Sequence, residues 1–289
     1  MTPQRALRQQ LAGDGIVVAP GVYDAFGAMM AERAGFETLY LSGASISYTR
    51  LGSPDIGLVG MNEVAGVMGQ IRERVGLPVI VDADAGFGNA LNVQRTVRVF
   101  ERSGASAIQL EDQQLPKRCG HLDGKTLISL QEMSGKIKAA TDVRADRDTM
   151  IIARTDSVAV EGIDAALDRA EAYVEAGADM LFVEAVQTEA DMRRTVAQFA
   201  GRLPLMVNMV EGGKTPVLAA DRLAEIGFKL VIFPGGLVRA IAKTMGRYFE
   251  SLRQEGTTSG FRDNMLNFTQ LNDLLGTQTI LENGRKYEE

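Results

Sequence analysis

Short apolar runs rich in β-branched residues recur along the chain and alternate with longer amphipathic segments. The short runs have the length of buried strands, and the longer segments carry apolar residues at helical spacing. The predicted strands cover residues 16–19, 38–41, 78–81, 107–110, 150–153, 180–183, 205–208 and 230–233. Helices are predicted between them, for example over residues 93–102, 163–176 and 189–199. Eight strand–helix units favour an α/β fold of the (β/α)8 TIM-barrel type over a doubly wound sheet.

Glycine follows three of the predicted helices, at Gly35, Gly104 and Gly177. Each stands in a short turn before the next predicted strand. A residue just past a helix C-terminus often adopts a left-handed conformation, which glycine tolerates best. These glycines therefore support the positions of the helix ends.

The 289 residues contain no low-complexity or Ser/Pro-rich linker, so we expect one barrel domain over residues 1–289. Residues 255–289 read as a C-terminal helical extension. Its apolar positions are Met265, Leu266, Phe268, Leu271, Leu274 and Leu275.

Composition narrows the class of protein. A net charge of −6 gives no basic footprint for nucleic acid. No apolar run approaches the roughly 18 to 20 residues of a membrane span, and the polar N-terminus lacks a signal-type apolar centre. We therefore expect a cytoplasmic protein without nucleic-acid or membrane partners. The single cysteine, Cys119, excludes an intrachain disulfide, and with the single histidine, His121, it supplies too few soft ligands for structural zinc.

Acidic and polar residues follow several predicted strands. They are Asp82, Asp84, Glu111, Asp112, Arg154, Asp156, Glu184 and Asn208. In a barrel the C-terminal strand ends share one face, so these side chains should meet there. Converging carboxylates repel one another unless a cation is bound or their pKa values are raised. An all-oxygen set suits Mg²⁺, with Mn²⁺ as a possible substitute. The alternative is that individual acids cap the helices that follow the strands.

A loop carries the cysteine and the histidine. Residues 113–125 follow the fourth predicted strand and include Pro116, Gly120 and Gly124, which a helix or strand would avoid. We expect this segment, called here the 113–125 loop, to be mobile. Its thiol, its imidazole and its three cations (Lys117, Arg118 and Lys125) could hold and protonate an anion. The alternative is a solvated basic loop with an incidental cysteine.

Motifs along nearly the whole chain resemble the isocitrate lyase and phosphoenolpyruvate mutase superfamily. They lie at residues 40–44, 51–55, 81–88, 111–113, 117–121, 153–156 and 158–162. The Lys-Arg-Cys-Gly-His segment at 117–121 is similar to the branch that cleaves carbon–carbon bonds, which includes 2-methylisocitrate lyase, dimethylmalate lyase and oxaloacetate hydrolase. The resemblance also implies that the last helix is exchanged with a neighbouring subunit in a homotetramer.

The resemblance implies roles for individual residues in a Mg²⁺-dependent retro-aldol cleavage of a 2-hydroxy dicarboxylate. For the metal it implies Asp84 as the direct ligand, with Asp55, Asp82 and Glu111 holding metal-bound waters. For the keto-acid half of the substrate it implies Ser42, Gly43, Ala44 and Arg154, with Glu184 and Asn208 completing the pocket. For the other half it implies Cys119 as general acid, beside Lys117, Arg118, Gly120 and His121. Tyr40 is the candidate base, and a tyrosine in the strand core is the alternative.

Departures from the family pattern bear on the substrate. The chain has Leu122 where 2-methylisocitrate lyases have an arginine, and an unpaired third carboxylate in a closed pocket would be expensive. A dicarboxylate such as 2,3-dimethylmalate is therefore favoured over 2-methylisocitrate. Pro234 after the last strand favours a lyase over oxaloacetate hydrolase. A phosphonate mutase or hydrolase, which would need no thiol, and a non-enzymatic sensor barrel are the rival classes.

Overall fold

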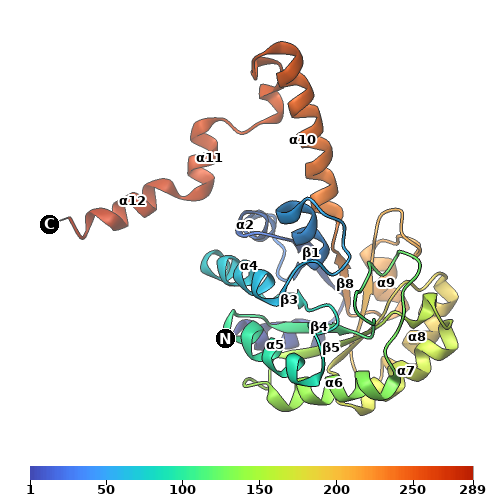
Figure 1. The fold of residues 1–289 in the computed structure, drawn as a ribbon. Helices are drawn as coiled ribbons and strands as arrows, with labels where there is room; N and C mark the ends of the chain where they lie inside the picture. Colours follow the sequence, from blue (N-terminus) through green and yellow to red (C-terminus); the bar gives the residue numbers. More distant parts are fainter. Residues whose placement is uncertain (289) are drawn as a thin grey trace. The chain divides into compact units, whose positions relative to one another are not determined.

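The computed structural model describes residues 1–288, and within them the parallel strands form a closed barrel in sequential order (Figure 1). The strands are β1 Val17–Val22, β2 Leu39–Leu41, β3 Val79–Asp82, β4 Ala107–Glu111, β5 Met150–Thr155, β6 Met180–Val183, β7 Leu205–Asn208 and β8 Leu230–Phe233. The barrel closes where Val17 of β1 pairs with Leu230 of β8. The predicted TIM-barrel class is confirmed, and each predicted strand corresponds to an observed one.

The first strand is longer than predicted. It continues through Pro20 and Gly21, which pair with Phe233 and Tyr40 respectively. A Cβ at Gly21 would lie 2.3 Å from the carbonyl oxygen of Pro234. Only glycine allows this approach of two backbones, so a residue type that usually interrupts strands is required inside this one.

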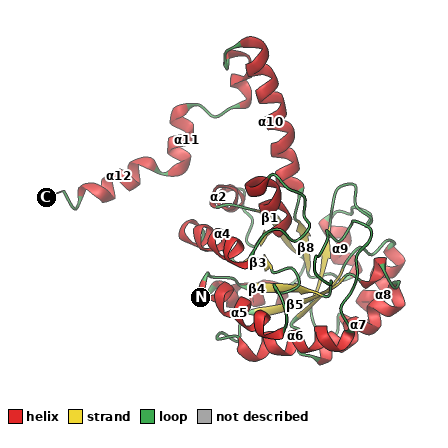
Figure 2. Cartoon of the chain, in the orientation of Figure 1, coloured by secondary structure: helices red, strands yellow, loops and turns green. Residues whose placement is uncertain are grey.

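Helices surround the barrel, as the red ribbons around the yellow strands show (Figure 2). The helices of the barrel region are α1 Pro3–Ala12, α2 Ala25–Arg33, α3 Gly43–Ile46, α4 Met61–Arg74, α5 Ala90–Arg102, α6 Leu130–Val143, α7 Ile163–Glu175, α8 Glu189–Phe199 and α9 Ala220–Ile226. Gly35, Gly104 and Gly177 have φ values of 90°, 96° and 100°. The predicted left-handed turns after three helices are therefore confirmed.

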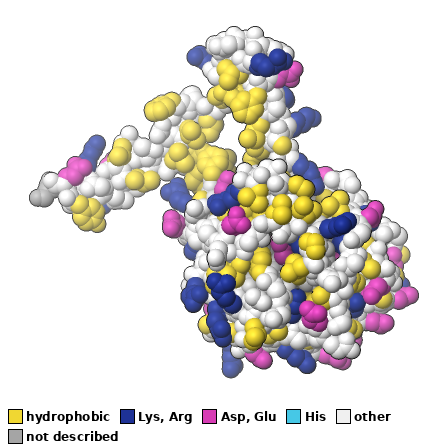
Figure 3. Space-filling model, viewed as in Figure 1, with side chains coloured by type: hydrophobic (Ala, Val, Ile, Leu, Met, Phe, Trp, Pro, Cys, Tyr) yellow, Lys and Arg dark blue, Asp and Glu magenta, His cyan; other side chains and the backbone are white. Residues whose placement is uncertain are grey.

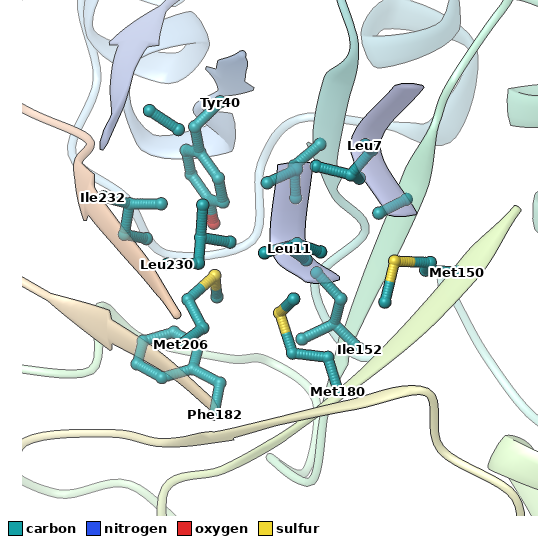
Figure 4. Packing of buried hydrophobic residues seen from close by; sticks show 13 residues of the cluster. Leu7, Leu11, Tyr40, Met150, Ile152, Met180, Phe182, Met206, Leu230 and Ile232 are labelled. Atoms are coloured by element: carbon teal, nitrogen blue, oxygen red, sulfur yellow. The ribbon is translucent and has the colours of Figure 1, made fainter. Parts of the chain in front are cut away.

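Apolar side chains fill the barrel interior (Figure 4). Helix α1 contributes Leu7 and Leu11, which pack into the same cluster as Met150, Ile152 and Met180 from the strands. Leu7 is fully buried. The interior is therefore a packed core rather than a channel, and the chemistry must lie at the strand ends.

The chain divides into two compact units, Met1–Val238 and the residues from Arg239 onward. The second unit contains most of α10 (Gly236–Glu255), a 3-10 helix (Ser259–Asn264), α11 (Phe268–Leu275) and α12 (Thr277–Arg285). Helices α11 and α12 bury none of their residues, and apolar side chains lie along their surface (Figure 3). No helix within residues 1–288 has the length and apolar character that a membrane span requires.

Candidate active site

Two aspartates at the end of β3 begin the acidic rim of the barrel. Asp82 is the last residue of the strand, and its carboxylate accepts the backbone N–H of Asp84 at 3.2 Å. Asp84 has a φ of 46°, a conformation that non-glycine residues rarely adopt. Such strain is typically held at functional sites, and here it turns a second carboxylate toward the rim.

The ammonium group of Lys117 lies between two carboxylates of the rim. Its Nζ is 2.5 Å from Asp55 Oδ1 and 2.7 Å from Asp84 Oδ1, and all three side chains are buried. The Asp84 contact is an ion pair rather than a well-directed hydrogen bond, because Oδ1 of Asp84 accepts none of good geometry. Lys117 was predicted to bind substrate, whereas the structure places its charge among the predicted metal-site acids.

Negative charge exceeds positive charge at this rim. Burial raises the pKa of Asp84 to about 7, since Asp82 and Asp55 nearby add to the effect and Lys117 offsets only part of it. Burial also raises the pKa of Glu111 well above its usual range, and the charge of Arg154 offsets this only in part. One ammonium group therefore does not neutralise the acids around it.

The donor set fits a divalent cation held mainly through water. Within residues 1–288, no three Asp, Glu, His or Cys side chains converge closely enough to hold a metal ion directly. One direct ligand, Asp84, with acids that bind metal-bound waters does not need such convergence, and Mg²⁺ usually keeps several waters. Glu111 Oε1 is buried without a hydrogen-bond partner, and Asp84 Oδ1 has only its ion pair with Lys117, so both oxygens suit this role.

Arg154 forms the positive centre of the site. Its Nε and Nη2 donate to the two oxygens of Asp156 at 2.9 and 3.1 Å, a bidentate pair that fixes the guanidinium plane. The same group lies 3.4 Å from Glu111 and 3.5 Å from Glu184. Asp156, which was expected at this face without a specific role, is thus the anchor of Arg154.

Asp112 holds Asp156 in place through its backbone. Its carboxylate accepts the backbone N–H of Asp156 at 2.9 Å and the hydroxyls of Thr155 and Tyr173 at 2.7 and 2.8 Å. Burial, followed by the charge of Asp156, raises its pKa. These hydrogen bonds use both carboxylate oxygens of Asp112, so its role is structural.

The 113–125 loop lies over the strand ends. At its base Gln113 and Leu127 form an antiparallel bridge. At its centre the carbonyl of Gly120 accepts a hydrogen bond from Lys125 Nζ, which also lies 3.3 Å from Asp156. A Cβ at Gly120 would lie 2.4 Å from Arg154 Nη2, so glycine is required for this close approach.

Cys119 is held beside the rim by backbone contacts. Its N–H donates to the carbonyl of Asp55 at 3.2 Å. Burial raises the pKa of the thiol, and a hydrogen bond from the His121 backbone lowers it by less. The group is therefore a protonated thiol at neutral pH, as a general acid needs to be.

His121 and Asn208 converge on Glu184. The imidazole Nε2 is 3.3 Å from Glu184 Oε1, and the Asn208 amide donates to Oε2 at 3.1 Å. Burial raises the pKa of Glu184, but Arg154 and these partners outweigh it and lower the pKa to about 2. Oδ1 of Asn208 is buried without a hydrogen-bond partner and can accept one from a ligand.

The segment after β2 brings backbone donors to the rim. Ser42 caps the short helix α3, because its hydroxyl accepts the N–H of Ser45 at 3.2 Å. A Cβ at Gly43 would lie 3.4 Å from Asp82 Oδ2, so this backbone borders the acids. The first amides of a helix have no carbonyl partner within it, which leaves Gly43 and Ala44 suited to bind an anion.

Three predicted positions lie elsewhere than expected. Arg118 is exposed and donates to the carbonyl of Asp123, so its guanidinium belongs to the outer face of the loop. Tyr40 is buried in the core cluster and donates to Gln109, and burial raises its pKa well above the usual value. The burial of Tyr40 and its hydrogen bond to Gln109 favour the alternative in which it is a tyrosine of the strand core.

Leu122 is 48% exposed and lies near Ile56 on the loop surface.

The family model described as phosphoenolpyruvate phosphomutase matches residues 7–253. The chain belongs to the phosphoenolpyruvate mutase and isocitrate lyase superfamily. The resemblance seen in the motifs is thus confirmed.

Relatives within this superfamily carry lyase names. The chain is 44% identical to the 2,3-dimethylmalate lyase of Eubacterium barkeri over 99% of both chains. It is 48% identical to the 2-methylisocitrate lyase of Aeropyrum pernix over 95% of this chain and 87% of the relative. A phosphonopyruvate hydrolase solved with oxalate and Mg²⁺ has a TM-score of 0.89 at 31% identity and covers both chains fully. The predicted relationship to carbon–carbon lyases is therefore confirmed.

Proposed function

We propose that this superfamily member cleaves the carbon–carbon bond of a 2-hydroxy dicarboxylate with methyl substituents, such as 2,3-dimethylmalate. The products would be pyruvate and propanoate. The observation that carries the proposal is the contact of Cys119 with Asp55, which places the thiol beside an acidic rim that also contains Arg154. Hydrolases and mutases that act on phosphonates do not need a thiol at this point.

We infer that Mg²⁺, held by Asp84 directly and by Asp55, Asp82 and Glu111 through water, is the cofactor, and that Mn²⁺ can replace it. When bound, the ion would polarise the hydroxyl and the neighbouring carboxylate of the substrate and favour loss of the hydroxyl proton. Support comes from the buried carboxyl groups of the rim, of which Asp82 and Asp55 raise the pKa of Asp84, and from the Mg²⁺ in the related hydrolase structure. Lys117 would move away from Asp84 as the ion binds.

The residues of the chain have separable tasks in this reaction. Arg154 and the backbone donors of residues 42–44 would bind the carboxylate of the half that becomes pyruvate. The C2 hydroxyl would give its proton to a carboxylate of the acidic rim. As the bond between C2 and C3 breaks, its electron pair stays with C3, and the C2 oxygen forms the carbonyl of pyruvate. Cys119 would then donate its proton to C3 of the enediolate and give propanoate.

The remaining loop residues would bind the other carboxylate and exclude water. His121 can donate from Nε2, and Gly120 lets the loop approach Arg154 closely. Closure over the substrate protects the enediolate from solvent. Arg118 would act by stabilising the loop through Asp123 rather than by touching the substrate.

A second candidate substrate is 2-methylisocitrate, which would give pyruvate and succinate. The 48% identity to a 2-methylisocitrate lyase and the exposed position of Leu122 favour it. Release of 2-oxo acid should be measured with Mg²⁺ on methylmalates, dimethylmalates, 2-methylisocitrate, isocitrate and oxaloacetate. We expect the highest kcat/KM for a dimethylmalate. Turnover of none of these compounds, or of a phosphonate instead, would contradict the proposal.

We also propose that the protein is a cytoplasmic homotetramer in which the C-terminal helices pack on a neighbouring subunit. The exposed apolar residues of α11 and α12, among them Phe268, Leu271 and Ile280, support this. Sedimentation of the full chain and of a chain ending before α11 would test it. A full-length monomer at micromolar concentration would contradict it.

A further inference from the structure

A turn between β7 and α9 lies directly against the imidazole of His121. The backbone N–H of Lys214 donates to Nδ1 of His121 at 2.9 Å, although the two residues are 93 positions apart in sequence. A Cβ at Gly213 would lie 2.7 Å from Nδ1 and 2.9 Å from Cε1 of the same ring. Glycine at 213 therefore lets the turn approach the ring closely enough for the Lys214 amide to reach it.

This contact determines where the imidazole carries its hydrogen. A ring nitrogen that accepts a backbone N–H has no hydrogen of its own, so the hydrogen of His121 must be on Nε2. Nε2 lies on the other side of the ring, 3.3 Å from Oε1 of Glu184, and it makes no well-directed hydrogen bond there, so the attraction to this carboxylate is electrostatic. The opposite tautomer would place a lone pair against that carboxylate and an N–H against the amide of Lys214. Both neighbours thus select the same tautomer.

We propose that Gly213 and the Lys214 amide are positioning elements that hold His121 as the Nε2–H tautomer, with Nε2 as a hydrogen-bond donor in the site. The catalytic meaning of this arrangement rests on the proposed lyase function. There, His121 would donate to a substrate carboxylate rather than exchange a proton with it. The turn also fixes the Cys119 thiol indirectly, because the backbone of His121 hydrogen-bonds that thiol.

An exposed ion pair accompanies this contact and provides a control. Lys214 Nζ is 2.6 Å from Asp123 Oδ1, and the side chain of Asp123 is 92% exposed. Pairs of this kind contribute little to stability. The proposal assigns the effect on His121 to the backbone of the turn and not to this pair.

His121 is the only histidine in the chain, so ring ¹⁵N labelling gives a single imidazole spectrum. In the full-length enzyme, in mildly alkaline buffer, we expect an unprotonated Nδ1 and a protonated Nε2. Gly213→Ala should shift the ring toward a mixture of tautomers and lower kcat/KM about tenfold or more, by analogy with groups that orient metal-binding histidines. Asp123→Asn should keep the parent tautomer.

A wild-type spectrum dominated by the Nδ1–H form would overturn the proposal, as would a Gly213→Ala variant with an unchanged tautomer. If Gly213→Ala does not fold, the wild-type spectrum alone decides. The NMR readout requires no substrate. If the protein gives the expected spectrum but turns over none of the diacids, the lyase function is refuted and the positioning of His121 still holds.

Discussion

Replacing Gly120 by alanine should hold the 113–125 loop away from the strand ends. The added Cβ would lie 2.4 Å from Arg154 Nη2, 2.7 Å from Glu184 Cγ and 3.0 Å from Asp156 Oδ1. Arg154 cannot move aside cheaply, because its bidentate pair with Asp156 fixes it. The loop must therefore retreat, and the thiol of Cys119 retreats with it.

The size of the effect follows from the cost of overpacking. An extra carbon in a well-packed region costs about 1–3 kcal/mol, which corresponds to a loss of roughly 5- to 150-fold in kcat/KM if the closed loop is required for the reaction. When the loop is open, the added Cβ does not meet Arg154, Glu184 or Asp156, so the overpacking cost is absent. The global stability of the protein should therefore change less than its activity.

Two measurements test this prediction. Release of 2-oxo acid gives kcat/KM, and the rate of tryptic cleavage after Lys117, which is buried in the closed loop, reports loop opening without any turnover. Gly135→Ala is the matched control, because nothing lies within 4 Å of a Cβ at that position in α6. Activity and cleavage rates of Gly120→Ala that both match the wild type would refute the reasoning.

The remaining predictions concern the acid, the metal, pH and the substrate. Cys119→Ser should lower kcat about 10²- to 10⁴-fold, the usual contribution of a general acid; retained lyase turnover in product-release assays would remove the thiol from the mechanism. Excess chelator should abolish turnover, Mg²⁺ or Mn²⁺ should restore it, and Asp84→Ala should not be rescued; full activity in chelator would exclude the metal. In chelator, the raised pKa of Asp84, about 7 against 3.8 unperturbed, favours folding at low pH, and this contribution is lost as pH rises through about 7. In thermal melts, the Tm of Asp84→Asn should therefore exceed that of the wild type by an amount that grows as pH rises toward about 7. A difference in Tm that stays constant with pH would contradict the raised pKa. With Leu122 in place of arginine, kcat/KM should be at least roughly tenfold higher on dimethylmalate than on 2-methylisocitrate, and equal values would refute the dicarboxylate assignment.

The barrel could be predicted from sequence because its signals are local. The run at residues 79–81 is apolar and β-branched, and Gly104 marks the end of the helix that follows. The second half of β1 was missed because Pro20 and Gly21 ordinarily interrupt strands. Only the approach of Pro234, more than 200 positions later, explains why glycine is needed there.

The site was predictable in its membership and less so in its geometry. A residue that directly follows a strand must lie at the C-terminal face of the barrel, which is why Asp84 and Glu184 could be assigned to the site from the sequence. The direction of a long side chain in the 113–125 loop depends on how the whole loop folds over the strand ends. Nothing in the neighbouring sequence therefore indicates that Lys117 pairs with Asp84 or that Arg118 points outward. The contact of Gly213 with His121 joins two loops and had none either.

The pairing of β1 with β8 has a consequence for how the chain is made. Val17 forms its hydrogen-bonded register with Leu230, so one edge of the first strand stays unpaired until most of the protein has left the ribosome. An unpaired apolar strand edge is a template for association with other chains. Pairings this distant in sequence form slowly. Nascent chains that end before Phe233 should therefore depend on chaperones, and release from them should coincide with synthesis of the last strand.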